Sequence, residues 1–310
     1  MSIHARLTAA AVLAVGIVGM ASGAASATPP GPGDCSSGVL ASGSYSSLSL
    51  SPGPCFIEPG SSVTVTRPLT LSTGSVLVVG STPEFSFGPA SLTIAGPMSL
   101  SGASGLIDIV GTVSVGGPVT VDPNALFEVP GSNPLPVTIG GGVTVGNQGA
   151  FIFGSLSPNG SAIRGPVRAT DPSTVQISGS EVSGPITVQG GGGNNAVIDA
   201  LPESSPGYNT LWLAGDTISG PVNVQGFDGN FLMIGSPQPD WGLGTSPGNT
   251  VSGPLTVTGN SLTGIPSLSE PGFWYVDANT VSGNAQCSAN GPGSNVGGSN
   301  IVSGHVNTCG

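Results

Sequence analysis

Five aspartates in the second half of the chain are the residues best suited to acid-base chemistry. Two carboxylates on either side of a glycosidic bond can hydrolyse it, one as the acid and the other as the base or nucleophile. The candidates are Asp199, Asp216, Asp228, Asp240 and Asp277. They are scattered along the chain and form no paired motif such as Asp-Asp or Asp-x-Asp. We therefore expect each to be a solvated loop carboxylate rather than part of a catalytic pair.

All three tryptophans lie in the same part of the sequence, at separations of 29 and 33 residues. Flat aromatic faces hold sugar rings, and neighbouring polar side chains orient those rings through hydrogen bonds. Trp212, Trp241 and Trp274, with Asp240 beside Trp241, are therefore the candidate carbohydrate-binding residues. Leucines on both sides point Trp212 outward if those leucines are buried, whereas the apolar neighbours of Trp274 show no alternation. The tryptophans could equally be apolar plugs beneath loops.

Other kinds of chemistry lack the residues that they need. Beyond residue 27 the only histidine is His305, near Cys309, so neither a Ser-His-Asp triad nor a zinc site is expected. The run of glycines at 190–193 is similar to a calcium-binding nonapeptide, but Asn195 occupies the usual aspartate position and no tandem copy follows. We expect no cofactor and no bound metal, and the sequence favours a non-enzymatic protein.

The net charge of the chain limits the classes of molecule that it can bind. Beyond residue 27 the chain has fifteen acidic residues, no lysine and three arginines, Arg67, Arg164 and Arg168, which gives a net charge of −12. A basic surface for nucleic acid or anionic lipid is therefore missing. We expect no nucleic-acid partner and no membrane insertion, which leaves glycans and surface proteins as partner classes.

The first 27 residues have the features of a secretory signal peptide. Arg6 precedes an apolar run from Ala9 to Met20, and small residues follow as far as Ala27. Cleavage before Thr28 would leave residues 28–310 as a single exported domain, either released or associated with the cell envelope. An uncleaved membrane anchor is the alternative, which the shortness of the apolar run disfavours.

A repeat organises the rest of the chain. Glycine and proline make up about a quarter of the residues, a share typical of low-complexity disorder unless a period accompanies it. A Gly-Pro step or a variant of it, followed in most copies by an apolar-polar-apolar stretch, occurs ten times. The copies begin at Arg67, Gly96, Gly117, Gly141, Gly165, Gly184, Gly220, Gly253, Gly283 and Gly304. The shortest intervals are about twenty residues, which suits one turn of a β-solenoid.

Each repeat predicts a strand that begins just after a corner. Proline cannot donate a ladder hydrogen bond and suits the first residue of a strand, while the preceding glycine tolerates the backbone angles of a sharp corner. Leu255 and Val257 should then point inward and Thr256 outward. Helix-forming residues are scarce. The predicted fold is all-β, a right-handed parallel β-helix of about ten coils.

Short polar residues recur four positions before the glycine of the later repeats. They are Ser180, Asp216, Asn249, Asn279 and Asn300. Such residues favour turns because their side chains bond to nearby backbone groups. If the coils stack, they form a polar ladder along one corner, and we interpret this ladder as structural.

With these features the chain resembles secreted bacterial parallel β-helix proteins, which carry repeated Ser-Gly-(Pro or Asn)-apolar-Thr-Val units after a signal peptide and a cysteine-bearing first coil. The matching segments are residues 183–188, 219–224 and 252–257, together with Cys35-Ser36-Ser37-Gly38 and Pro54-Cys55. The resemblance covers most of the chain beyond residue 27. Because its motifs encode coil geometry, it implies the fold and no particular activity.

Four cysteines lie near the two ends of the repeat region. Cys35 and Cys55 are 20 residues apart and Cys287 and Cys309 are 22 apart, each close to the length of one coil. Pairing within each end is favoured, because the other two connectivities would join opposite ends of a rod. An exported compartment permits both disulfides. They would hold an N-terminal cap at residues 28–60 and a C-terminal cap at residues 281–310.

The sequence thus predicts a secreted, non-enzymatic β-helix scaffold or surface interaction protein. The alternative is a carbohydrate-binding or polysaccharide-active β-helix that uses the long coils of residues 199–280.

Overall fold

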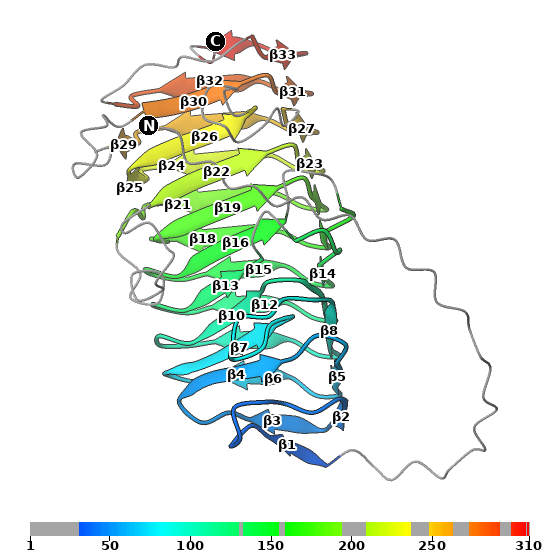
Figure 1. The fold of residues 1–310 in the computed structure, drawn as a ribbon. Helices are drawn as coiled ribbons and strands as arrows, with labels where there is room; N and C mark the ends of the chain where they lie inside the picture. Colours follow the sequence, from blue (N-terminus) through cyan, green and yellow to red (C-terminus); the bar gives the residue numbers. More distant parts are fainter. Residues whose placement is uncertain are drawn as a thin grey trace, which may run out of the picture.

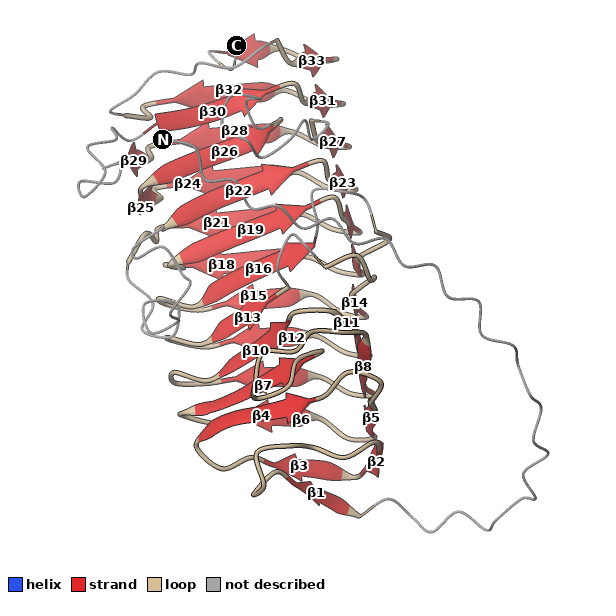
Figure 2. Cartoon of the chain, in the orientation of Figure 1, coloured by secondary structure: helices blue, strands red, loops and turns tan. Residues whose placement is uncertain are grey.

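The computed structural model describes residues 31–129, 133–154, 159–193, 209–236, 248–262, 273–291 and 299–307, together with residue 309. The predicted signal peptide lies outside these residues. The described part of the chain consists of strands and turns without a helix (Figure 2). Accordingly, no helix there has the length and apolar character of a membrane span.

Three long sheets run along the molecule and form its sides (Figure 1). The nine-stranded sheet contains β4 (Gly53–Ile57), β7 (Ser75–Val79), β10 (Gly105–Asp108), β13 (Leu126–Glu128), β16 (Ala150–Gly154), β19 (Thr174–Ser178), β22 (Thr210–Ala214), β26 (Phe231–Gly235) and β30 (Phe273–Asp277). The eleven-stranded sheet contains β2 (Gly43–Tyr45), β5 (Ser62–Val65), β8 (Ala90–Ile94), β11 (Gly111–Val115), β14 (Thr138–Ile139), β17 (Ala162–Ile163), β20 (Glu181–Val182), β23 (Thr217–Ile218), β27 (Thr250–Val251), β31 (Thr280–Val281) and β33 (Ile301–Val302). The ten-stranded sheet contains β6 (Leu69–Leu71), β9 (Met98–Leu100), β12 (Val119–Val121), β15 (Val143–Val145), β18 (Val167–Thr170), β21 (Ile186–Gln189), β24 (Val222–Gln225), β28 (Leu255–Thr258), β32 (Ala285–Ser288) and β34 (Val306–Asn307).

Two short pairs complete the described strands. They are β1 (Pro32–Asp34) with β3 (Ser47–Ser49), and β25 (Asp228–Gly229) with β29 (Ser261–Leu262).

Each coil supplies one strand to each long sheet in turn. The chain passes through β22, β23 and β24, and then repeats the same path one level higher through β26, β27 and β28. Strands of successive coils pair in parallel, for example β22 with β26 and β24 with β28. The predicted all-β parallel β-helix is confirmed, and sheets of nine, eleven and ten strands agree with about ten coils.

One hydrophobic core fills the interior from Cys35 to Cys309. The alternation predicted for residues 255–257 is present, because Leu255 and Val257 are buried while Thr256 is half-buried on the outer surface. Within the core, Phe127 and Phe151 occupy equivalent positions in adjacent strands, with ring centroids 5.3 Å apart. Stacking of identical positions therefore builds the core coil by coil.

The physical reason for glycine at the Gly-Pro corners differs from the one expected. Gly253 does not have a positive φ, so backbone freedom is not what selects glycine here. A Cβ at this position would lie 2.8 Å from the backbone nitrogen of Pro221 in the preceding coil, and Gly220 and Gly283 are equally close to a proline of their preceding coils. Glycine is required because successive coils contact each other through bare backbone at this corner.

Both predicted disulfides are present at the ends of the core. Cys35 pairs with Cys55 and Cys287 pairs with Cys309, with Cα atoms 6.0 and 5.0 Å apart. Cys55 is paired in register with the buried Leu77, and Cys287 with the buried Val257. Each disulfide thus closes a row of inward side chains where the solenoid ends.

Candidate functional site

The outer surface of the nine-stranded sheet differs from that of the other two sheets. Its central outward row runs in register through Phe56, Val78, Ile107, Glu128, Ile152, Gln176, Trp212, Met233 and Tyr275. This row, which we call the outer row, is mainly apolar. Outward positions of the eleven-stranded sheet are more polar, as at Thr217, Thr250 and Thr280. Four of its apolar members, Val78, Ile107, Met233 and Tyr275, are nonetheless only 4–8% exposed, so the row is largely covered, and Phe56, Ile152 and Trp212 are its partly exposed apolar members.

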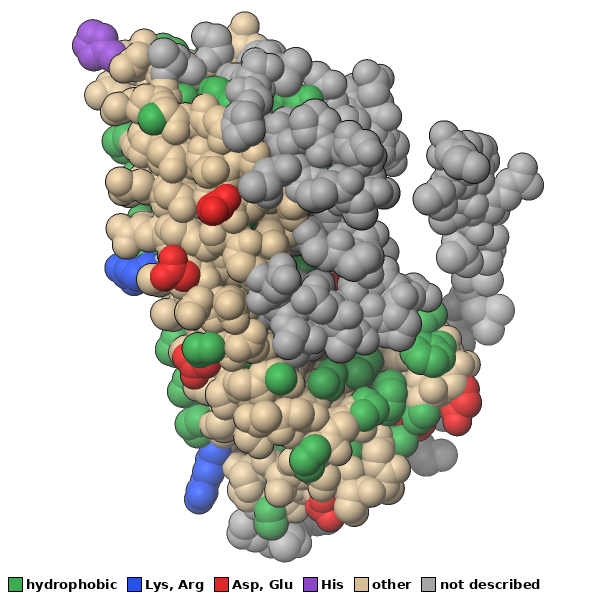
Figure 3. All heavy atoms as spheres, turned by 90° about the vertical axis from the view of Figure 1, so that its left-hand side faces the viewer, with side chains coloured by type: hydrophobic (Ala, Val, Ile, Leu, Met, Phe, Trp, Pro, Cys, Tyr) green, Lys and Arg blue, Asp and Glu red, His purple; other side chains and the backbone are tan. Residues whose placement is uncertain are grey.

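A second apolar cluster lies on this outer side. Ile107, Leu126 and Ala150 are buried, and partly buried neighbours such as Val76 and Ile152 pack against them. In the space-filling view, hydrophobic side chains gather at the lower right, at the level of the N-terminal coils, whereas acidic side chains are scattered singly (Figure 3). Burial raises the pKa of Glu128, which lies in the outer row beside Ile107 and Ile152.

Trp212 lies in the outer row, as the flanking leucines predicted. Its side chain is half-buried, and its indole nitrogen is buried with no hydrogen-bond partner in the described part of the chain. Beside it, Gln176 pairs in register and donates a hydrogen bond from Nε2 to Oγ1 of Thr210 at 2.6 Å. An apolar ring edged by amide and hydroxyl groups is the combination that sugar-binding sites use.

The structure does not bring the described tryptophans together on one surface. Trp274 is 9% exposed and belongs to the interior core, where it pairs in register with Leu232. It therefore faces the opposite side of the sheet from Trp212. Trp241 and Asp240, the other proposed ligand-binding residues, lie outside the described residues.

The candidate carboxylates have unlike environments. Asp228 is exposed in β25, as expected for a solvated residue. The expectation of solvation is wrong for Asp216 and Asp277, which are 1% and 7% exposed. Asp199 and Asp240 lie outside the described residues. Among the described residues no three His, Cys, Asp or Glu side chains gather as metal ligands would.

Asp216 is buried because it belongs to the predicted polar ladder, which the structure confirms. Ser180, Asp216, Asn249, Asn279 and Asn300 each precede a strand of the eleven-stranded sheet, and we call them the corner ladder. The backbone N–H of each rung donates to the side-chain Oδ1 of the next. The distances are 2.9 Å from Ser180 to Asp216, 2.9 Å from Asp216 to Asn249, 3.2 Å from Asn249 to Asn279 and 3.0 Å from Asn279 to Asn300.

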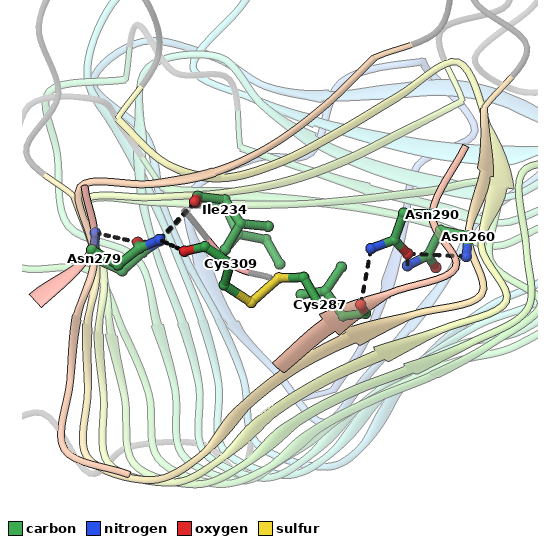
Figure 4. Close-up of a disulfide and its surroundings, with 9 residues drawn as sticks. Ile234, Asn260, Asn279, Cys287, Asn290 and Cys309 are labelled. Carbon is green, nitrogen blue, oxygen red and sulfur yellow. Dashed lines mark hydrogen bonds between the residues drawn. A yellow bond between two sulfur atoms is a disulfide. The ribbon is translucent and has the colours of Figure 1, made fainter. Parts of the chain in front are cut away.

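A second ladder was not predicted. Asn260 Oδ1 accepts a hydrogen bond from the backbone N–H of Phe227 at 2.8 Å, and Asn290 Oδ1 accepts one from Asn260 at 3.2 Å. Figure 4 shows Asn260 and Asn290 on one side of the Cys287–Cys309 disulfide and Asn279, a rung of the corner ladder, on the other. The signal available in the sequence was an asparagine three positions after the inward residues Val257 and Cys287.

Asp108 is a further buried carboxyl that sequence reasoning missed. It pairs in register with Val79 inside the solenoid, and its Oδ2 accepts a hydrogen bond from Nδ2 of Asn133 at 2.9 Å. Burial raises the pKa of Asp108 to about 7, and the Asn133 hydrogen bond lowers it by a smaller amount. Its other oxygen, Oδ1, is buried and has no hydrogen-bond partner in the described part of the chain.

The polar groups of the described coils thus serve two purposes. Most buried ones connect successive coils, and the group around Trp212 faces outward and is the candidate binding site. In comparisons with known proteins, no family model, no curated protein and no solved structure matches the chain.

Proposed function

We propose that the protein is a secreted, non-enzymatic rod that acts as an extracellular scaffold or surface interaction protein. The observation that carries this proposal is the use of the buried carboxyl and amide side chains. Asp216 and Asn249 are occupied by backbone groups of neighbouring coils, and Asp108 by Asn133. Side chains committed in this way stabilise a stack of coils and are not free to transfer protons to a substrate.

Export is consistent with the two disulfides, since such bonds persist in oxidising compartments. The predicted signal peptide and the net charge of −12 beyond residue 27 support an extracellular protein that binds neither nucleic acid nor anionic lipid. The partly exposed apolar members of the outer row, Phe56, Ile152 and Trp212, are the side chains that such a rod would present to a protein partner.

The experiment is an assay of the mature, oxidised protein against a panel of plant, fungal and bacterial polysaccharides, with new reducing ends and unsaturated products as readouts. We expect no turnover and a rod that resists proteolysis. A mock purification from cells that do not make the protein controls for contaminating enzymes. Turnover by the folded protein that the mock preparation lacks would overturn the scaffold proposal.

A second candidate function is carbohydrate binding at Trp212, favoured by the half-buried indole beside Gln176 and Thr210. A glycan array tests it with the wild type, Trp212→Ala and Gln176→Ala. Thr187→Ala, in an outward position of the ten-stranded sheet, is the matched control. Binding that is lost in the first two variants and kept in the control, with unchanged circular dichroism, supports a site at Trp212. Binding that survives Trp212→Ala would remove this residue from the proposal.

A further inference from the structure

One rung of the corner ladder is an acid where the next three are amides. Asp216, Asn249, Asn279 and Asn300 occupy equivalent positions in successive coils. In each, Oδ1 accepts the backbone N–H of the preceding rung. The Oδ1 atoms of the acid and of the amides therefore make the same hydrogen bond. The four side chains differ only in the second polar atom, which is Oδ2 in Asp216 and Nδ2 in the asparagines.

In the three asparagine rungs, the Nδ2 atom donates to the carbonyl oxygen of a core residue in the preceding coil, at 2.8 Å in each case. The pairs are Asn249 with Leu213, Asn279 with Ile234 and Asn300 with Val276. These three acceptors occupy one register column, and the preceding member of that column is Ile177. The equivalent acceptor for Asp216 is therefore the carbonyl of Ile177.

Asn249 and Asn279 also donate from Nδ2 to Oδ1 of the next rung, both at 2.9 Å. The atom of Asp216 that corresponds to Nδ2 is Oδ2, which is buried and has no hydrogen-bond partner in the described part of the chain. An ionised carboxylate only accepts hydrogen bonds, whereas a protonated one also donates one. Every equivalent position in the ladder calls for a donor at this atom.

We propose that Asp216 is held in the folded rod as a neutral carboxylic acid, whose Oδ2 proton replaces the amide hydrogen of the asparagine rungs, and that its ionisation is a pH-sensitive weak point in the corner ladder. The proton would be donated to the carbonyl of Ile177 or to Oδ1 of Asn249. Loss of the proton would leave a buried charge that only the backbone N–H groups of Ser180 and Ala214 offset, with no donor at Oδ2 and no cation beside it in the described part of the chain, which is strongly unfavourable.

The surroundings of Asp216 contain no compensating cation among the described residues. The neighbouring rungs Ser180 and Asn249 are uncharged. Glu181, which follows Ser180, points outward and pairs at 3.7 Å with Arg164, and this is the single ion pair in the described part of the chain. Asp277, near the rung two coils further on, is another acid. Burial accordingly raises the pKa of Asp216 to about 8, and hydrogen bonds from the backbone lower it by less.

The sign of the effect follows from linkage. The unfolded chain loses this proton near pH 4, whereas the folded chain keeps it to about pH 8. The contribution of Asp216 to stability is complete below about pH 4, declines as the pH rises to about 8, and is constant above that. One proton bound in excess by the folded state changes the unfolding equilibrium constant by up to tenfold per pH unit in this window.

The test is urea unfolding of the mature, oxidised protein at pH 4, 6 and 9, with wild type, Asp216→Asn and the control Asp171→Asn, whose side chain is exposed. Between pH 4 and pH 9, the unfolding equilibrium constant of the wild type divided by that of Asp216→Asn should rise by about 100-fold or more. On a logarithmic scale this is on the order of half the change that linkage allows. Over the same pH range, the unfolding constant of the wild type divided by that of Asp171→Asn should change by less than threefold. A constant ratio for Asp216→Asn would overturn the proposal.

A spectroscopic measurement on the unsubstituted ladder makes the test independent of whether that variant folds. In Asp108→Asn protein labelled with ¹³C at aspartate side chains, a protonated carboxyl band should persist above pH 6 and disappear as the pH passes 8. Absence of that band in the folded protein at pH 6 would overturn the proposal by itself.

Discussion

At the scale of single residues, one amide side chain joins its own coil to four groups of the two neighbouring coils. Asn279 accepts from the backbone N–H and the Nδ2 of Asn249, and it donates to the carbonyl of Ile234 and to Oδ1 of Asn300. At this corner the N–H of each rung donates to a side chain and not to a backbone carbonyl of the next coil, and buried backbone groups without partners are costly. The amides supply those missing partners.

Removal of one rung should therefore cost more than an ordinary polar substitution. Asn279→Ala leaves the N–H of Asn249 and the carbonyl of Ile234 without these side-chain partners, and each unsatisfied buried group costs about 1 to 3 kcal/mol. We expect the free energy of unfolding, from guanidinium titration, to fall by about 3 kcal/mol. The control is Asn223→Ala, a half-buried outward residue of β24, which should change it by about 0.5 kcal/mol or less. Equal losses in the two variants would contradict a structural ladder.

The buried pair of Asp108 and Asn133 predicts its own pH dependence. The folded protein keeps the Asp108 proton to about pH 7 because of burial, and the unfolded chain releases it near pH 4, so stability should fall as the pH rises through this window. Asp216 contributes a similar slope. Asp108→Asn should thus lower the slope of unfolding free energy against pH between about 5 and 6.5 by close to the contribution of one proton. Chemical denaturation along a pH series measures it, and an unchanged slope would show that Asp108 is already ionised in the folded state.

At the scale of the element, the sequence predicted what local periodicity encodes. Alternation in residues 255–257 identified inward and outward side chains, because the side-chain period of a strand is two. The corner ladder was visible because its residues stand at a constant distance from a recognisable Gly-Pro step. Trp274 was ambiguous because Phe273, Tyr275 and Val276 are all apolar and remove the alternation.

The features that the sequence did not predict depend on contacts between coils. Asp108 and Asn133 are 25 residues apart and meet only after stacking. Asn260 and Asn290 form a ladder too short to stand out as a repeat. The close approach at the Gly-Pro corners is equally a property of two coils, so the sequence suggested a conformational role for glycine where the structure shows a steric one.

That steric role gives a prediction for the corner element. Gly253→Ala would place a Cβ 2.8 Å from the nitrogen of Pro221 and 3.0 Å from the carbonyl carbon of Gly220, both backbone atoms that cannot move without shifting a coil. We expect a loss of about 2 kcal/mol in unfolding free energy, within the range of overpacked cores. Gly291→Ala is the matched control, since nothing lies within 4 Å of its Cβ position. If both alanine variants were equally stable, the contact between coils would not be what selects glycine.

At the scale of the whole molecule, the rod is a stack in which each coil is covered by the next, and only the end coils lack a neighbour on one side. Stability in such a stack is approximately a sum over coils and the interfaces between them. The C-terminal end is joined to the corner ladder as well as to the core, because Asn300 donates from Nδ2 to the carbonyl of Cys309 at 2.7 Å. The Cys287–Cys309 disulfide, drawn in Figure 4, therefore holds the residue to which Asn300 is bonded.

The two disulfides should consequently protect different ends of the rod. Replacing both Cys287 and Cys309 by serine removes a disulfide that contributes about 3 kcal/mol of stability by closing a loop. This loss of stability should be confined to the coils nearest to the disulfide. We expect amide hydrogen exchange in β31 and β33 to accelerate by about 100-fold, while exchange in β5 and β8 stays within threefold of wild type. Replacement of Cys35 and Cys55 should give the reverse pattern. Faster exchange spread evenly from β5 to β33 would instead mean that the rod unfolds as one cooperative unit, and that each disulfide acts on the stability of the whole molecule.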